Sequence, residues 1–167
     1  MAGLKAPSLG YIELFHHKIS NLEEYKPFRR DVGYLFQESN DCFICPSVLD
    51  DVTFSLLSRG EDEDGSRAKA EEILRELEIW HLQDEIVFNL SGGEKKLVAL
   101  AGILVAKPKI LLLDEPTTAL DADMQRRIAA ILKSLDVTQI IVSHDKEFIS
   151  DVASVMYRLT KNELESI

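Results

Sequence analysis

The fold of this chain is decided by the stretch Ile110-Leu111-Leu112-Leu113-Asp114-Glu115-Pro116. Four apolar residues in a row are typical of a strand that is buried on both faces of a parallel sheet. Proline has no N–H to donate to a strand ladder, so we expect Pro116 to end the strand. Sheets of this class bind ligands outside the carboxyl ends of their strands. Asp114 and Glu115 are therefore expected at a site, on opposite faces of the chain.

The two adjacent carboxylates suit two kinds of chemistry. One of them can hold a hard cation such as Mg²⁺, and the other can orient or deprotonate a water molecule. The alternative interpretation is a strand that ends in ordinary acidic turn residues. The polar residues that follow other strands at the same edge of the sheet can distinguish a binding site from a simple turn.

The composition predicts one soluble globular domain with a substantial core. The chain has 167 residues, of which 46% are hydrophobic and 29% are charged. A formal net charge of −10 disfavours broad binding to nucleic acid. No run approaches the about 18 apolar residues that a membrane span needs, and the first seven residues lack the apolar block of a signal peptide.

Cys42 and Cys45 form a C-x-x-C pair. These are the two cysteines of the chain, so the pair cannot supply a four-cysteine zinc site. A redox pair is one interpretation. Two ordinary buried or half-buried thiols are the other.

Short apolar strands and amphipathic helices surround the central stretch. Their alternation from Leu90 onward implies a parallel α/β sheet with right-handed crossovers. We expect residues 22–30 and 59–65 to be loops and residues 160–167 to be a turn and a frayed end. The other predicted strands cover 11–15, 32–36, 139–142 and 154–159, and the predicted helices cover 47–57, 66–79, 95–106, 122–135 and 146–152.

Asn89-Leu90-Ser91-Gly92-Gly93-Glu94 immediately precedes the most apolar of these helices. Free amides and the positive end of the helix dipole attract anions, and glycine lets a phosphate approach the backbone. The same residues are also consistent with a simple helix start.

Two more polar residues follow predicted strands. Gln37 comes after the strand over 32–36, and His144 comes after the strand over 139–142. Carboxyl ends of parallel strands meet at one edge, so both are expected near Asp114 and Glu115. A solvated loop amide and a structural histidine are the alternatives.

Together these segments resemble the ATP-binding cassette (ABC) family of ATPases. Five motifs occur in the family's order over residues 33–145. They are Phe36-Gln37 (Q-loop), Leu90-Ser91-Gly92-Gly93-Glu94 (signature, with Glu94 where glutamine is usual), Ile110 to Pro116 (Walker B with its adjoining glutamate), Ala119-Leu120-Asp121 (D-loop) and His144 (switch histidine).

A finer resemblance is to the ATPase subunits of energy-coupling-factor and cobalt/nickel-type importers. It is carried by Val32 to Gln37, by Asp50-Asp51-Val52-Thr53-Phe54 and by Leu90 through Gly102. It implies a transported solute among transition-metal ions and small vitamins. It also implies that the region from Gln37 to Leu57 docks on a membrane partner.

One motif of the family does not occur. The Walker A loop, G-x-x-x-x-G-K-[ST], holds the phosphates and Mg²⁺ through its amides, lysine and hydroxyl, and the 167 residues contain no such run. The resemblance therefore implies that residues 1–167 form a single truncated ABC-type nucleotide-binding domain. Its expected fold is α/β: a P-loop NTPase-like parallel sheet flanked by helices, with a helical subdomain at about 46–93, and with the N-terminal strand and P-loop missing. Apolar surface is then expected to be exposed on Leu112, Val142 and Ile103.

The resemblance implies a role for each matching residue. Asp114 and Gln37 hold Mg²⁺, while Glu115 acts on the attacking water and His144 contacts the γ-phosphate as catalytic residues. Gln37 also belongs to the nucleotide-binding set, in which Asp121 works across the interface of a head-to-tail dimer. The rest of that set is the signature group Ser91, Gly92, Gly93 and Glu94.

The implied function is that of an ATP-binding and ATPase subunit of an importer, with ATP and Mg²⁺ as cofactors. The expected partners are a second ABC ATPase subunit and a transmembrane subunit, and no nucleic-acid partner is expected. The expected location is the cytoplasmic face of the cell membrane. One alternative is a non-hydrolytic cassette that donates its signature motif to an intact subunit. The other is a soluble cassette protein of repair or translation, which the absence of a second cassette and of a long coiled coil disfavours.

Overall fold

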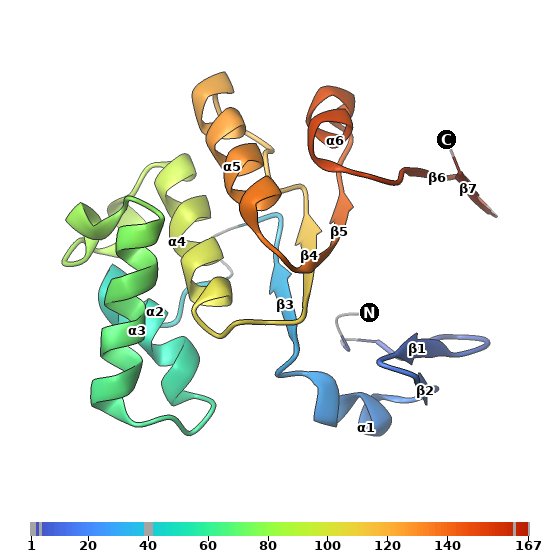
Figure 1. Cartoon of the computed structure of the whole chain (residues 1–167), viewed down its shortest axis with the longest axis horizontal. Helices are drawn as coiled ribbons and strands as arrows, with labels where there is room; N and C mark the ends of the chain where they lie inside the picture. Colours follow the sequence, from blue (N-terminus) through green and yellow to red (C-terminus); the bar gives the residue numbers. More distant parts are fainter. Residues whose placement is uncertain (1–2, 4, 39–41, 162, 167) are drawn as a thin grey trace.

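A three-stranded parallel sheet forms the centre of the computed structural model, which describes residues 3, 5–38, 42–161 and 163–166. The strand order is β3 (Val32–Leu35), β4 (Ile110–Asp114) and β5 (Thr138–Val142). Because all three strands run parallel, their carboxyl ends lie at one edge of the sheet (Figure 1). The apolar run of the sequence thus forms a strand of a parallel sheet, as predicted, and the structure shows that it is the middle strand.

One face of the sheet is covered by helices α4 (Gly92–Leu104), α5 (Ala122–Ser134) and α6 (Lys146–Val152). These helices and the strands share a single hydrophobic core. Its members include Leu35, Leu111 and Leu113 of the strands, Leu97 and Leu100 of α4, Ile128 and Leu132 of α5, and Phe148 of α6. Helices α4 and α5 begin at the edge where the strands end (Figure 1).

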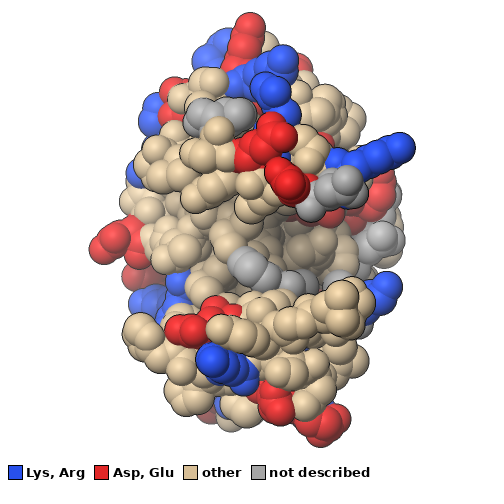
Figure 2. All heavy atoms as spheres, turned by 90° about the vertical axis from the view of Figure 1, so that its right-hand side faces the viewer, with Lys and Arg blue, Asp and Glu red and all other residues tan. Residues whose placement is uncertain are grey.

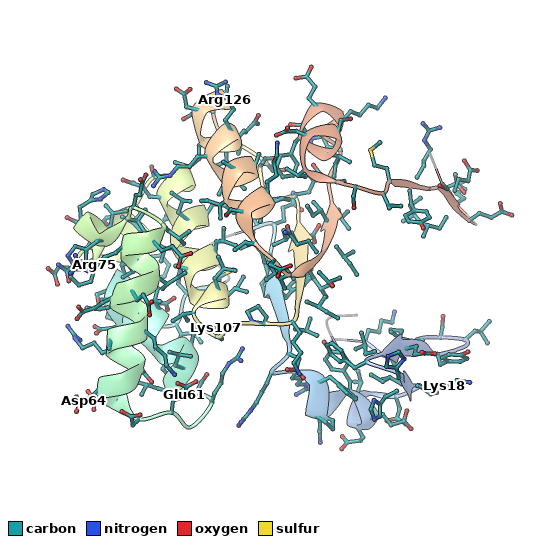
Figure 3. All side chains as sticks on the ribbon, in the orientation of Figure 1. Lys18, Glu61, Asp64, Arg75, Lys107 and Arg126 are labelled. Carbon is teal, nitrogen blue, oxygen red and sulfur yellow. The ribbon has the colours of Figure 1, made fainter. Side chains whose placement is uncertain are left out.

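A second helical layer packs against α4. It consists of α2 (Val48–Leu57), α3 (Glu63–Glu76) and the short 3-10 helices η3 (Trp80–Leu82) and η4 (Val87–Asn89). Its apolar side chains join the same core, while charged residues such as Asp64 and Arg75 lie on its outer side (Figure 3).

Two antiparallel hairpins stand on the other side of the sheet (Figure 1). β1 (Ile12–Leu14) and β2 (His17–Ile19) form the first, followed by α1 (Leu22–Tyr25) and the 3-10 helix η1 (Lys26–Phe28). β6 (Tyr157–Leu159) and β7 (Leu164–Ser166) form the second, and every residue of these two strands is exposed.

The face of the sheet that carries no helix is partly open. Among the described residues β5 pairs only with β4, so its outer edge is free. Ile140 is 38% exposed and Val142 is 61% exposed. Figure 2 shows that the molecule is deeply hollowed on this side, between an upper and a lower part.

The expectation of exposed apolar surface is correct for Val142 and wrong for Leu112, which is 7% exposed. Leu112 lies on the middle strand, opposite Tyr34 of β3 and Ile140 of β5, so neighbours cover it from both sides. Ile103 is half-buried, because its side chain packs on Gly33. A Cβ atom at Gly33 would lie 2.3 Å from a methyl group of Ile103.

Several predicted boundaries are wrong, among them the helix start expected at Lys95, which the structure has at Gly92 after the Ser91 cap. Residues 22–30 contain α1, whose start is capped by Asn21 accepting from the Glu24 amide at 3.0 Å. α3 begins at Glu63 rather than at Ser66, since Asp62 accepts from the Gly65 amide at 2.8 Å. Residues 160–167 contain β7, which the sparse apolar residues of the tail did not predict.

The open edge of β5 predicts self-association of the isolated chain. Ile140→Lys places a charge on this edge and should reduce light scattering on mild heating, because edge charges oppose strand pairing. Leu9→Lys is the matched control: Leu9 is 92% exposed outside any strand, and the charge changes equally. Equal scattering by the two variants would contradict the assignment of β5 as the associating edge.

Candidate active site

Glu115 is the centre of the site. Its backbone adopts a φ of 46°, in the left-handed region that glutamate uncommonly occupies, and its amide donates to the Val142 carbonyl at 2.8 Å. Its side chain is 15% exposed. One carboxylate oxygen, Oε1, lies 2.8 Å from His144 Nδ1 and accepts from the His144 amide at 3.0 Å. The other, Oε2, accepts from the hydroxyls of Thr118 at 3.1 Å and Ser143 at 3.2 Å.

These contacts set the charges of the pair. Burial alone would raise the pKa of Glu115, but the hydrogen bonds from His144, Thr118 and Ser143 outweigh it and hold the pKa below its ordinary value. The hydrogen bond to Glu115, followed by its charge, raises the pKa of His144. Glu115 is therefore ionised at neutral pH, and a carboxylate of low basicity orients a water molecule more effectively than it deprotonates one.

Asp114 is the last residue of β4 and directly precedes Glu115. Its Oδ2 accepts from the Tyr34 hydroxyl at 3.2 Å. Burial, then the charge of Asp114 and this hydrogen bond, raise the pKa of Tyr34. Within the described part of the chain, Oδ1 of Asp114 has no hydrogen-bond partner, so a hard oxygen donor stays available.

This donor set fits Mg²⁺. No group of three or more His, Cys, Asp or Glu side chains gathers into a metal cage among the described residues. Mg²⁺ does not need such a cage, since it is usually bound by one or two carboxylates together with waters and substrate phosphates. Asp114, with Gln37 just beyond the end of the neighbouring strand β3, is consistent with that mode of binding.

Gln37 lies two residues beyond the end of β3, beside the end of β4. Its carbonyl accepts a hydrogen bond from Lys96 Nζ at 2.9 Å, and the Phe36 carbonyl accepts from the same ammonium at 3.3 Å. The side chain of Gln37 is exposed at the edge that also carries Asp114 and Glu115.

Ser91, Gly92, Gly93 and Glu94 form the start of α4. Ser91 and Glu94 make a capping box: the Ser91 amide donates to Glu94 Oε2 at 2.8 Å, and the Glu94 amide donates to Ser91 Oγ at 3.3 Å. The bonds from Ser91 hold the pKa of Glu94 below its usual range. Glu94 therefore closes the start of α4 together with Ser91. A Cβ atom on Gly92 would have no heavy atom within 4 Å, so this backbone is open to a ligand.

Asp121 caps α5 by accepting from the Met124 amide at 2.9 Å. A Cβ atom on Gly93 would lie 2.8 Å from the Met124 side chain, so the starts of α4 and α5 touch. The predicted site residues therefore fall into two groups at the same edge of the molecule. One group gathers at the strand ends, and the other at the helix starts (Figure 1).

Sequence reasoning missed four residues that hold the site together: Tyr34, Lys96, Thr118 and Ser143. Lys96 is only 2% exposed. Burial lowers the pKa of its ammonium, and the charges of Cys42, Glu38 and Asp114 raise it by a smaller amount. A lysine four residues after Gly92 and four before Leu100, on the buried stripe of an apolar helix, was the available signal. Tyr34 had no such signal, because it is 80 residues from Asp114 in the sequence.

No helix in the described ranges has both the length and the apolar content that crossing a bilayer requires.

Comparison with known proteins gives the chain's relatives. A family model described as ABC transporter matches residues 1–118. The energy-coupling factor transporter ATP-binding protein EcfA of Methanothermobacter thermautotrophicus is 36% identical over 166 residues, covering 97% of this chain and 53% of that protein. Other curated relatives are 38–41% identical to this chain, and the chain covers 54–73% of their length.

Among the solved structures that share the fold are two at more than 25% identity. One is cbiO1 from Clostridium perfringens, described as part of the ABC transporter complex cbiONQ. Its TM-score is 0.80 at 32% identity, covering 93% of this chain and 64% of that one. The other is a dimeric ATP-binding cassette in a post-hydrolysis state bound to ADP and Pi. Its TM-score is 0.79 at 28% identity, covering 90% of this chain and 69% of that one.

The pair of Glu115 and His144 predicts a pH dependence. The pKa of His144 is raised in the folded state. Its contribution to the stability of the fold is therefore fully present below pH 6.5, the ordinary pKa of histidine, and is lost as the pH rises through the raised pKa. The stabilisation from Glu115 is present above 4.5 and is lost as the pH falls through its lowered pKa. An NMR titration of the His144 ring should show Glu115→Gln lowering the pKa of His144.

Glu165→Gln is the control for this titration, since Glu165 lies on the exposed hairpin strand β7 and carries the same charge. It should leave the titration of His144 unchanged. An identical midpoint for His144 in all three proteins would show that Glu115 does not hold the imidazolium.

Proposed function

Since the chain belongs to the ABC transporter family and is of the energy-coupling-factor type of ABC ATPase, we propose that it is an ATP-binding subunit of an importer. In this role it couples ATP binding and hydrolysis to the uptake of a metal ion or a small vitamin. Residues 1–167 act as one nucleotide-binding domain with its helical subdomain at about 46–93. The observation that carries the proposal is the convergence of Glu115, His144 and Asp114 at the ends of two paired strands.

The strand-end group has a separate task for each residue. Asp114 and Gln37 hold Mg²⁺, which when bound neutralises charge on the phosphate oxygens. Glu115 accepts a hydrogen bond from the attacking water and orients it. The side chain of His144 is 78% exposed and uses Nδ1 on Glu115, so Nε2 is left to meet the γ-phosphate.

The helix-start group serves a nucleotide held by a second cassette. Ser91, the open Gly92 amide and the Gly93 amide beside Met124 provide donors at the positive end of α4, where a phosphate is stabilised. Glu94 keeps the first turn of the helix closed through its capping box. Asp121, joined to this group through Met124 and Gly93, faces the same partner. The dimeric cassette that shares this fold, bound to ADP and Pi, supports such a pairing.

The membrane partner is a transmembrane subunit that meets residues 37–57, at the cytoplasmic face of the membrane. The described residues of this region include Ile44, which is 73% exposed. The complex cbiONQ, of which the structural relative cbiO1 is part, supports an assembly with further subunits. A net charge of −10 does not favour a nucleic-acid partner.

The geometry of the helix-start group supports a second function. The 167 residues carry no Walker A run, so they do not themselves supply the phosphate loop that the strand-end group faces. The helix-start group needs no such loop in the same chain. We therefore propose as the alternative a non-hydrolytic cassette that donates Ser91, Gly92 and Gly93 to an intact partner.

An ATPase assay tests both functions. If the alternative holds, the purified chain alone shows no turnover. The test cassette is of the EcfA type, keeps its own Walker A loop and carries a disabled signature motif. It should gain ATPase turnover when this chain is added. Gly92→Glu should reduce that gain about 100-fold or more, because the space in front of this amide is open and a carboxylate there repels phosphate.

Leu9→Glu, at a 92% exposed position, changes the charge equally and should leave the gain intact. Turnover by the chain alone that Glu115→Gln abolishes would contradict the alternative and support a complete hydrolytic site. If the disabled cassette gains nothing from the chain and the chain has no turnover alone, both functions are wrong.

A further inference from the structure

Lys96 is a buried lysine in the second turn of α4. It is 2% exposed, although a lysine ammonium is rarely buried unless it is paired or hydrogen-bonded. Its partners are two main-chain carbonyls, those of Gln37 at 2.9 Å and Phe36 at 3.3 Å. Neither carbonyl belongs to the helix that carries the lysine, so the contact joins α4 to the end of β3.

The two carbonyls lie where β3 stops being held by the sheet. The ladder between β3 and β4 ends with Leu35 opposite Leu113. Beyond that point, the hydrogen bonds from Lys96 are the ones that the described structure assigns to the carbonyls of Phe36 and Gln37. The position of the Gln37 backbone therefore depends on a side chain of α4.

The same helix carries the residues of the helix-start group. Ser91, Gly92 and Gly93 stand at its cap and in its first turn, and Lys96 comes about one turn later. A shift of α4 along its axis consequently moves both Ser91 and the ammonium that holds Gln37. Burial on an apolar core keeps this helix rigid, since Leu97, Val98 and Leu100 are at most 1% exposed.

We propose that Lys96 is a positioning residue. Its ammonium fixes the backbone of Phe36 and Gln37 to helix α4, so that the Gln37 side chain is placed beside Asp114 and follows movements of the helix start. The link between Lys96 and Gln37 stands on the structure alone, and its consequence for Mg²⁺ and ATP rests on the proposed function.

Amide hydrogen exchange of the whole chain without nucleotide tests the link. Lys96→Met keeps the length of the side chain and removes its donors, and exchange over residues 36–38 should become about 10-fold faster or more. Amides of β4 should change much less, because a methionine packs in an apolar core. Lys96→Arg retains a charged donor and should return exchange over residues 36–38 to the rate of the unaltered chain.

Lys95→Met is the matched control. Lys95 is half-exposed and precedes Lys96 directly, and within the described chain no hydrogen bond is assigned to its side chain. Its loss should not change exchange over residues 36–38. Unchanged exchange there in Lys96→Met, or equal acceleration throughout β4 and α4, would overturn the positioning role and leave Lys96 as a structural charge.

A measurement on the unaltered chain covers the case in which Lys96→Met does not fold. The ¹⁵N-labelled ammonium of Lys96 should give an NMR signal that exchanges with water at least about 10-fold more slowly than that of Lys95. Equal exchange of the two ammonium groups would overturn the proposal. Since neither experiment contains ATP, a failure of the proposed function would leave both results unaffected.

Discussion

The hydrogen bonds that converge on Glu115 join the ends of two parallel strands, and the candidate active site depends on them. The Glu115 amide extends the pairing of β4 with β5 through the Val142 carbonyl, and its carboxylate then meets the residues that follow β5. Strand pairing and the proposed chemistry thus use neighbouring atoms of one residue. A change in the register of β5 would separate His144 from Glu115 at once.

Helices α4 and α5 connect this strand edge to the rest of the molecule. Gly93 brings the two helix starts into contact at Met124, where a larger residue would collide. Lys96 ties α4 back to the end of β3. The strand-end and helix-start groups are therefore held by one rigid core rather than by separate loops, which suits a site that has to be completed by a second molecule.

Much of the fold could be predicted from local patterns. The apolar run at 110–113 and the helical spacing of 47–57 and 146–152 matched the structure closely, since burial periodicity is a property of neighbouring residues. The starts of α1 and α3 were missed because Asn21 and Asp62 cap them, and capping competes with the loop signal of the same polar residues.

The site was predicted as a set of positions, and the structure places them at one edge. The contacts among them could not be predicted in the same way. Tyr34 reaches Asp114 only through the pairing of β3 with β4, and the ammonium of Lys96 finds its carbonyl partners only after α4 has packed. Such contacts depend on tertiary structure, and no local pattern specifies them.

The most direct measurement is a structure of this chain bound to an intact EcfA-type cassette and a non-hydrolysable ATP analogue with Mg²⁺. The account predicts that phosphate oxygens lie within hydrogen-bond distance of Ser91 and the Gly92 amide of this chain, with Asp121 at the same interface. A nucleotide held by the other cassette alone, with Ser91 and Gly92 exposed to solvent, would contradict it.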